Sequence, residues 1–352
     1  MLIVKKLLIP VTIVTIIIAS YIFYLSITDY KPDEIVILPI SNNQVKTLPS
    51  NEEITIATFN IGYGGLDEAQ DNYSQNGLGV KASSKEKVED NLNGVTKVLD
   101  LFEPDILLFQ EIDIKSSRSY RVDQLAYLSE KYPNYSYIYG KNYDVAWNPF
   151  PLLKPLGKIE SGLATFSRFY STWAYRYSLP GQEDGFHKYY DYDRSFLVSR
   201  FDVENGETLL VINLHLSDFS QTGIRRHEEF QYLKNFLIEE ARKGSYIVVG
   251  GDWNHNLPGM DPYKFKTDES WPSWLKNIPE EFKIAGLKWI ENTIAPTVRS
   301  LSKPYERDSN FLATTDGFFI SENIAVSRIF TYSKHDFKYS YHNPVIIKLS
   351  LK

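Results

Sequence analysis

The feature that most restricts what this chain can fold into is a long apolar run near its amino terminus. Residues 7–27 form a stretch of 21 residues without a charged side chain, and Lys5 and Lys6 come directly before it. An α-helix needs about 20 residues to cross the roughly 30 Å hydrocarbon core of a bilayer. The run therefore predicts a transmembrane helix over residues 7–27.

The two lysines also predict on which side of the membrane each end of the chain lies. Basic residues stay on the cytoplasmic side, so residues 1–6 are predicted to be a cytoplasmic stub and everything after Asp29 to be extracellular. A cleaved signal peptide is the alternative, because Ala19 and Ser20 are small residues suited to cleavage. The apolar run continues to Ile27, which is long for a signal sequence, and we therefore prefer an anchor. A cleaved signal would leave a secreted protein.

The rest of the chain divides into a linker and one domain. Residues 28–53 contain three prolines among polar residues, a composition that predicts an extended linker. Strand-like runs then recur at 54–60, 106–111, 209–216, 246–249, 315–321 and 345–351, and the segments 86–102 and 224–241 have the apolar spacing of helices. Strands interrupted by a few helices predict an α+β domain over residues 54–352, with packed sheets that helices partly cover.

The composition limits the kind of site that this domain can carry. The chain has no cysteine, which excludes disulfide bonds and thiolate metal ligands. Metal binding is thus restricted to Asp, Glu, Asn and His, and such oxygen-rich ligands favour hard cations. The net charge of −6 argues against binding of nucleic acid by a broad, positively charged surface.

Polar and ionisable side chains stand where one predicted strand after another ends. They are Asn60, Glu111, His215, Asp252 and Asn254. A single polar residue at a strand end usually belongs to a turn, but several together indicate a shared site at one edge of the sheets. Carboxylates for a cation, amides for phosphate oxygens and imidazoles for proton transfer are the groups that phosphoester hydrolysis requires.

Six short segments that contain these residues resemble, in order, the motifs of the endonuclease/exonuclease/phosphatase superfamily. They are TFNI at 58–61, FQEI at 109–112, NLHL at 213–216, GDWN at 251–254, TDGF at 315–318 and HNPV at 342–345. Together they extend over nearly the whole predicted domain. The resemblance implies a four-layer α/β-sandwich, in which two packed mixed β-sheets are flanked by helices. It also implies a metal-assisted hydrolysis that uses two histidines.

The resemblance further implies a role for each of the strand-end residues. Glu111, helped by Asn60, would hold a divalent cation, for which Mg²⁺ is the first choice and Mn²⁺ and Ca²⁺ are the alternatives. Asp252 and Asn254 would position the attacking water and a phosphate oxygen. These four positions match the pattern of the superfamily.

The histidines follow the same pattern, with one departure beside them. By the resemblance, His342 would be the general base, oriented by Asp316, and His215 would donate a hydrogen bond or a proton to the scissile phosphate. The last motif of the superfamily normally reads Ser-Asp-His, but here it is Ser340, Tyr341 and His342. A phenol is a weak metal ligand near neutral pH. The sequence therefore predicts reduced activity, and a relative that binds without catalysis is an alternative.

The substrate class is less constrained. Arg118 and Arg194 are candidates for contacting phosphate, and the aromatic segment 132–150 is a candidate lip of the site or part of the core. The predicted function is hydrolysis of phosphoester bonds outside the membrane, in a lipid head group or a small phosphorylated molecule, because the anchor holds the site near lipid. An extracellular nuclease that acts on nucleic acid is the alternative. The sequence gives no sign of an obligate protein partner.

Overall fold

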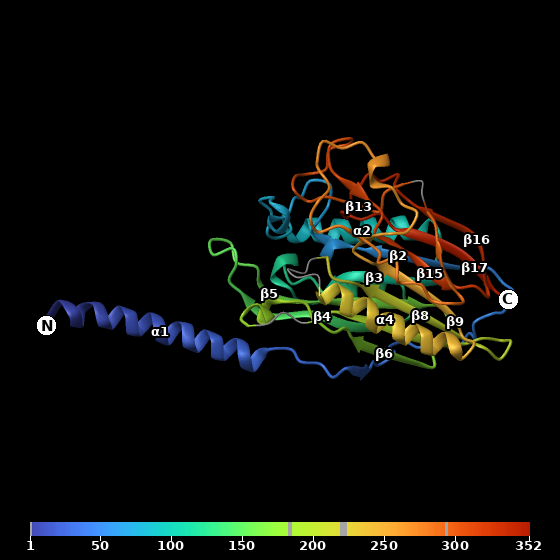
Figure 1. The fold of residues 1–352 in the computed structure, drawn as a ribbon, viewed down its shortest axis with the longest axis horizontal. Helices are drawn as coiled ribbons and strands as arrows, with labels where there is room; N and C mark the ends of the chain where they lie inside the picture. Colours follow the sequence, from blue (N-terminus) through green and yellow to red (C-terminus); the bar gives the residue numbers. More distant parts are fainter. Residues whose placement is uncertain (1, 182–184, 219–223, 293–294) are drawn as a thin grey trace.

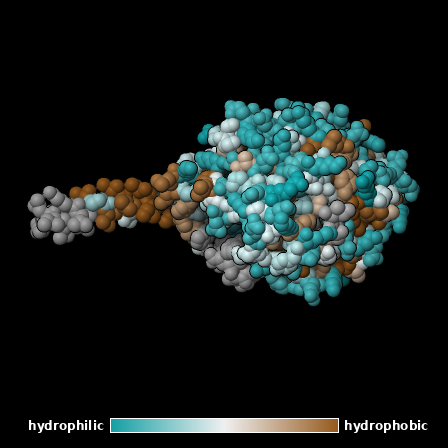
Figure 2. Space-filling view, turned by 90° about the horizontal axis from the view of Figure 1, so that it is seen from above, coloured by the Kyte–Doolittle hydropathy of each residue, from teal (hydrophilic) through white to brown (hydrophobic). Residues whose placement is uncertain are grey.

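A long apolar helix leads into the domain. The protein is described here by a computed structural model over residues 2–181, 185–218, 224–292 and 295–352. Helix α1 (Leu2–Thr28) stands out from the domain, and its apolar surface is brown in the space-filling view (Figures 1 and 2). Its part Ile9–Thr28 is long and apolar enough to cross a membrane, a test that a signal sequence near the amino terminus would also pass. Of the predicted stub, Met1 lies outside the described residues.

Two β-sheets form the body of the domain. The seven-stranded sheet contains, in spatial order, β1 (Ile35–Ile37), β6 (Trp173–Ser178), β7 (Ser195–Asp202), β8 (Thr208–His215), β9 (Tyr246–Asp252), β15 (Asp316–Ser321) and β12 (Leu287–Ile290). The six-stranded sheet contains β16 (Ile324–Thr331), β17 (Val345–Leu351), β2 (Ile54–Asn60), β3 (Ile106–Asp113), β5 (Gly157–Ser167) and β4 (Ser136–Asn148). Both sheets are mixed, because β2 is parallel to β3 and β8 is parallel to β9 while their other neighbours are antiparallel.

Short elements complete the described part of the chain. Two-residue strands pair as β10 (His255–Asn256) with β11 (Lys276–Asn277), and as β13 (Val298–Arg299) with β14 (Leu312–Ala313). The 3₁₀ turns are η1 (Gly62–Gly64), η2 (Tyr73–Gln75), η3 (Ser117–Ser119), η4 (His187–Tyr190) and η5 (Pro262–Lys264). All six predicted strands are present, with ends that differ from the prediction by up to three residues.

Helices cover the outer face of each sheet, which gives the four layers. Helix α2 (Lys85–Asp100) buries Val88, Leu92 and Leu99 against the six-stranded sheet, and the short helix α3 (Gln124–Lys131) adds Leu128 to the same core. Helix α4 (Ile224–Arg242) buries Phe230, Leu233 and Leu237 against the seven-stranded sheet. The spacing of three to four residues that predicted the two longer helices therefore corresponds to the faces that they bury.

The inner faces of the sheets pack on each other through aliphatic and aromatic side chains. Ile56, Leu108 and Ile347 of the six-stranded sheet meet Val211, Val248 and Phe318 of the other sheet. The α+β sandwich expected from the sequence is confirmed. Its core holds the two sets of strand ends in a fixed relation, since well-packed interiors deform little.

A buried polar contact also joins the two sheets, close to the carboxyl ends of β3 and β8. Gln110 Nε2 donates a hydrogen bond of 2.8 Å to Asn213 Oδ1, and Asn213 Nδ2 donates to the carbonyl of Ala164 at 3.0 Å. Satisfied polar contacts of this kind fix one arrangement of a core. We infer that this bridge sets the register of β3 against β8, and so the distance between the ends of the two strands.

The segment predicted as a linker lies along the domain. Strand β1 pairs antiparallel with the edge strand β6, and Ser41 bridges to Tyr137. Leu48 is fully buried and bridges to Val203. This segment is therefore attached to the edges of both sheets, which ties the direction of α1 to that of the domain.

The aromatic segment 132–150 is mainly core. Tyr132 and Tyr135 are buried, and the ring of Tyr132 packs on Phe166 with 6.1 Å between centroids. Only its far end, where β4 finishes, presents aromatic rings to solvent, namely Trp147 and Phe150. The prediction of a lip therefore does not hold for the first half of the segment, because those rings fill the space under α2 and α3.

Candidate active site

The carboxyl ends of four strands meet at one edge of the sandwich. Strand β2 ends at Asn60 and is parallel to β3, which carries Glu111 near its end. In the other sheet, β8 ends at His215 opposite Asp252, the last residue of the parallel strand β9. Asn60 Nδ2 donates to Asp252 Oδ2 at 3.0 Å and so joins the two sheets at this edge. The fold thus brings these four predicted residues together.

Two further residues reach the same place from the other direction. Asp316 is the first residue of β15 and lies opposite Asp252 in the antiparallel pair β15–β9. His342 comes shortly before β17, and the neighbouring Ser340 Oγ donates to the carbonyl of Asn60 at 2.8 Å. All six side chains are buried, so the groups interact in a medium that screens charge less than water does.

A carboxylate between two imidazoles forms the centre of the cluster. Asp252 Oδ2 lies 3.4 Å from Nε2 of His215 and 3.6 Å from Nε2 of His342. Nδ1 of His342 donates to Asp316 Oδ2 at 2.7 Å. The bond to Asp316 fixes the orientation of the His342 ring and leaves its Nε2 facing Asp252, which is the arrangement that the resemblance implies for a histidine base.

Burial and neighbouring charges separate the two histidines. Burial, followed by the positive charge of Arg194, lowers the pKa of His215 well below its usual value. Burial would also lower the pKa of His342, but the carboxylates of Asp316 and Asp252 outweigh it and raise that pKa. Burial and the charge of Asp316 raise the pKa of Asp252 to about 7. The proton near neutral pH therefore resides on His342 rather than on His215.

Glu111 is held in an unusual backbone conformation. Its φ is +58°, and the register of β3 against β5 shifts between Phe109 and Ile112. A bulge of this kind turns a strand residue toward a new direction and is common beside active sites. Here it turns the Glu111 carboxylate toward Asn60, whose Nδ2 donates to Glu111 Oε1 at 3.1 Å.

Tyr341 occupies the position at which the superfamily normally has a carboxylate. Its hydroxyl donates to Glu111 Oε1 at 2.7 Å, and its ring meets His342 edge-on with 4.2 Å between centroids. Burial and the charge of Glu111 raise the pKa of Tyr341 well above its usual value, so the phenol stays neutral and acts as a donor. Tyr341 thus takes up one oxygen of the predicted metal ligand.

The donor groups in the cluster fit a hard divalent cation. Asp252, Asp316 and His342 offer ligand atoms that all lie within 4.8 Å of one another. Asp316 Oδ1 is buried and has no hydrogen-bond partner among the described residues. Carboxylates and imidazole without thiolate are the ligands that Mg²⁺ and Mn²⁺ accept. The predicted ligands Glu111 and Asn60 adjoin this group.

As placed, Asn60 and Asn254 direct their amide nitrogens to protein partners. Asn60 Oδ1 accepts from the backbone N–H of Gly62 at 3.0 Å, while its nitrogen faces the carboxylates. Asn254 Nδ2 donates to the carbonyl of Leu216 at 2.7 Å, and the Asn254 backbone N–H donates to Asp252 Oδ1 at 2.9 Å. Asn60 would therefore bind a cation only after a flip of its side-chain amide exchanges the positions of Oδ1 and Nδ2. The roles expected for both residues stay predictions.

The two arginines, Arg118 and Arg194, lie near the cluster and differ in their hydrogen-bond and ion-pair partners. Arg118 forms two hydrogen bonds of 3.1 and 2.9 Å with the carboxylate of Asp113, which compensates its charge. Arg194 stacks on Tyr192 with 3.8 Å between the guanidinium carbon and the ring centroid. Its Nε is buried without a hydrogen-bond partner in the described part of the chain. Arg194 Nη2 also lies 3.7 Å from Oδ1 of the exposed Asp218, so Arg194 is the less tightly paired of the two arginines. Sequence reasoning overlooked Asp113, although it stands at the end of the same strand as Glu111.

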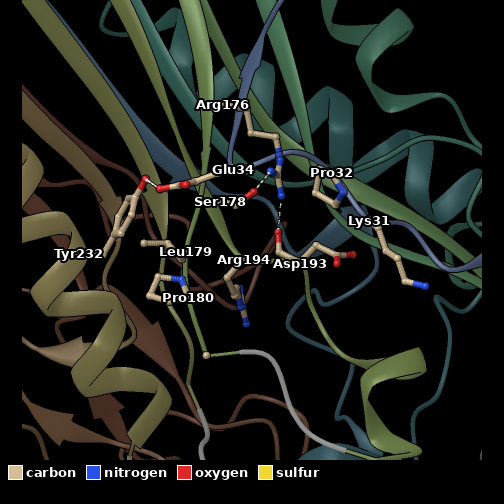
Figure 3. Close-up of a pocket in the computed structure, with 11 residues that line it drawn as sticks. Lys31, Pro32, Glu34, Arg176, Ser178, Leu179, Pro180, Asp193, Arg194 and Tyr232 are labelled. Atoms are coloured by element: carbon tan, nitrogen blue, oxygen red, sulfur yellow. Dashed lines mark hydrogen bonds between the residues drawn. The ribbon is translucent and has the colours of Figure 1, made fainter.

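A cavity of about 490 Å³ is lined in part by Arg194. It lies between the linker residues Lys31–Glu34 and strand β6, and Figure 3 shows Tyr232 donating to Glu34 across one end of it. Arg176 also lines the cavity and donates hydrogen bonds to Ser178 and to the carbonyl of Asp193 (Figure 3). Because it contains none of the strand-end residues, this cavity is distinct from the candidate active site.

Solved structures share the fold. The chain superimposes with a TM-score of 0.56 on an endonuclease/exonuclease/phosphatase from Beutenbergia cavernae, at 18% identity over 86% of this chain and 72% of that one. The score is 0.54 for an endonuclease/exonuclease/phosphatase from Bacteroides vulgatus, at 17% identity over 86% and 100%. It is 0.51 for the human nocturnin catalytic domain with a bound sulfate anion, at 16% identity over 86% and 95%. At these identities the likeness shows the fold.

Sequence comparison identifies the family. No curated protein matches the chain in sequence. The model of the Endonuclease/Exonuclease/phosphatase family matches residues 57–333, which contain five of the six motifs. Because this match spans most of the chain, the protein belongs to the endonuclease/exonuclease/phosphatase family, whose members hydrolyse phosphoesters.

Proposed function

We propose that the protein is a metal-dependent hydrolase of phosphoester bonds that acts outside the membrane to which α1 anchors it. The observation that carries the proposal is the buried arrangement of Asp252 between Nε2 of His215 and Nε2 of His342, at 3.4 and 3.6 Å, with Glu111 beside it. Two imidazoles of opposite pKa shift around one carboxylate are suited to proton transfer.

A divalent cation would be held by Glu111, with Asn60 beside it. When bound, such a cation stabilises the negative charge that grows on the phosphate oxygens as the ester bond breaks. Its charge would also lower the pKa of His342, since a nearby cation disfavours a protonated imidazole.

The chain's own groups would perform the proton transfers. His342, oriented by Asp316, accepts a proton at Nε2 from the attacking water, which Asp252 positions as a hydrogen-bond acceptor. His215 is held neutral by burial and by Arg194, so its Nε2–H donates a hydrogen bond to a phosphate oxygen rather than a full proton. Arg194 contacts the same anion through its uncommitted Nε, whereas Arg118 supports the site from its pair with Asp113.

The position of the anchor favours a lipid head group or a small phosphorylated molecule as substrate. The apolar helix ends where the linker starts, and the linker is attached to the domain, so the site stays near the bilayer. The acidic net charge of −6 argues against a polyanion such as DNA. A non-catalytic relative is the second candidate, and the contact between Tyr341 and Glu111 favours it, because that contact uses a predicted ligand oxygen.

A substrate panel separates these functions. The full chain in detergent with Mg²⁺ is expected to hydrolyse bis-nitrophenyl phosphate and phosphodiester lipids in preference to single- or double-stranded DNA. His215→Ala, purified in the same way, is the control for contaminating enzymes. Cleavage of DNA alone would identify a nuclease. Binding of these compounds without turnover of any of them would favour the non-catalytic relative.

A further inference from the structure

The loop that joins β4 to β5 presents apolar side chains to solvent. Trp147 is 44% exposed, Phe150 is 47% exposed, Leu152 is 76% exposed and Leu153 is 97% exposed. Loops that face water usually carry polar residues and glycine at such positions. Single exposed apolar residues are ordinary, but a group of them on one projecting loop indicates an interaction surface.

Two backbone hydrogen bonds hold the conformation of this loop. The N–H of Lys154 donates to the carbonyl of Pro151 at 2.9 Å, and the N–H of Leu156 donates to the carbonyl of Phe150 at 3.1 Å. Leu156 itself is buried. These bonds close a turn that points the two leucines, Leu152 and Leu153, away from the domain, while the exposed side chain of Lys154 stands beside them.

The end of β4, where the loop begins, is joined to the last turns of α1. Tyr21 Oη donates to the carbonyl of Trp147 at 2.9 Å and shares a hydrogen bond of 2.7 Å with Tyr190 Oη. Phe150 packs edge-on against the same Tyr190, with 6.1 Å between centroids. Figure 1 shows the green β4–β5 loop projecting from the domain above the end of α1, and in Figure 2 brown surface continues from the helix to the near end of the domain.

The length of the apolar run places this contact within the outer leaflet of the membrane. All of residues 7–27 are needed to span a bilayer of about 30 Å, because a helix rises about 1.5 Å per residue. Tyr21 precedes Ile27 by six residues, which puts Tyr21 about 9 Å inside the outer end of the span. Whatever touches α1 at Tyr21 must therefore lie beneath the head groups, in the outer part of the acyl chains.

The same hairpin projects from the edge that carries the candidate active site. Strand β3 ends with Asp113 paired to Ser161, whereas β4 and β5 continue until Asn148 pairs with Gly157. The hairpin therefore passes the end of β3 by four residues of β5, or about 13 Å at 3.3 Å per residue. A surface that receives the hairpin tip must face the edge of the sandwich on which Glu111 lies.

We propose that the β4–β5 loop is a second membrane contact, which inserts Leu152 and Leu153 into the outer leaflet beside α1 and turns the active-site edge toward the lipid head groups. Tryptophan and leucine on one face with a lysine at the rim are suited to an interface. The partner is the outer leaflet of the membrane that α1 spans. The inference rests on the proposed function in one respect, since it assumes the extracellular anchor.

Single-cysteine labelling tests the insertion directly, because the chain has no native cysteine. The full chain with Leu153→Cys carries an environment-sensitive fluorophore and is reconstituted into phosphatidylcholine nanodiscs with quencher groups on the acyl chains. Val45→Cys is the matched control. Val45 is 95% exposed and lies beyond the opposite end of β5, where the N–H of Tyr170 donates to the carbonyl of Lys46 at 2.8 Å.

We expect strong quenching and a blue-shifted emission at position 153, and neither change at position 45. Equal, water-like emission at both positions would overturn the proposal. This readout needs no turnover, so it can fail or succeed independently of the proposed function. As a second measurement, the double variant Leu152→Glu with Leu153→Glu should hydrolyse lipid in nanodiscs about tenfold more slowly or worse but keep its rate on a soluble diester. An unchanged rate on nanodisc lipid would also count against insertion.

Discussion

Replacing His342 by alanine is expected to lower kcat for every phosphoester substrate by about 10²- to 10⁴-fold, the range found when a general base is removed. His342 combines a 2.7 Å bond to Asp316 with an Nε2 that faces Asp252 at 3.6 Å. The loss should appear in kcat more than in KM, because the imidazole acts on the proton of the attacking water rather than on the bound substrate. Initial rates at saturating substrate and Mg²⁺ provide the measurement.

His335→Phe is the matched control for this loss. Both ring nitrogens of His335 are buried, but the ring lies among those of Phe59, Tyr332 and Tyr339, and neither nitrogen has a hydrogen-bond partner among the described residues. Phenylalanine should fill the same space and leave kcat unchanged. If His342→Ala kept most of its activity, or if His335→Phe lost as much, the role of His342 as the base would be wrong.

Tyr341→Asp should raise the apparent affinity for Mg²⁺ by about ten- to a hundredfold, the usual effect of a group that supports a metal site. The substitution removes the hydroxyl that donates to Glu111 Oε1 and adds a carboxylate beside Glu111 and Asp252. Without metal, the added buried charge and the lost ring should lower the melting temperature. Addition of Mg²⁺ should restore part of that loss, because a ligand that binds only the folded state stabilises it.

Tyr341→Phe distinguishes the two effects of the aspartate. It frees the oxygen of Glu111 but adds no charge, so its Mg²⁺ affinity should lie between those of the native chain and Tyr341→Asp. The measurements are the Mg²⁺ dependence of the rate and thermal unfolding with and without chelator. A rate for Tyr341→Asp that is unchanged or lower at saturating Mg²⁺ would show that Tyr341 is an adapted part of this site.

Much of the fold and of the cluster could be predicted from local patterns. The runs at 54–60 and 345–351 coincide with β2 and β17, because short runs rich in apolar and β-branched residues favour buried strands. Polar residues at the ends of parallel strands must share an edge, which is why Asn60, Glu111, His215 and Asp252 come together. These relations depend on periodicity and topology, and both are visible in the sequence.

Contacts between distant segments could not be predicted in this way. The bond from Tyr341 to Glu111 joins residues 230 positions apart, and the pair of Arg118 with Asp113 depends on the turn that follows β3. The attachment of the linker and the exposure of Leu152 and Leu153 follow from which edges and loops are left uncovered after packing. No local pattern reports on that outcome, since it depends on the whole tertiary arrangement.

A magnesium titration of hydrolysis is the most direct test of metal-dependent catalysis at this site. The full chain and Glu111→Gln are treated with chelator, Mg²⁺ is added back, and the rate of bis-nitrophenyl phosphate hydrolysis is followed. We expect no rate in chelator and a saturable return with Mg²⁺ in the native chain. Glu111→Gln should need at least about tenfold more Mg²⁺ or stay inactive. A rate that survives chelation, or the same titration curve for both proteins, would contradict a cation on Glu111 as the basis of catalysis.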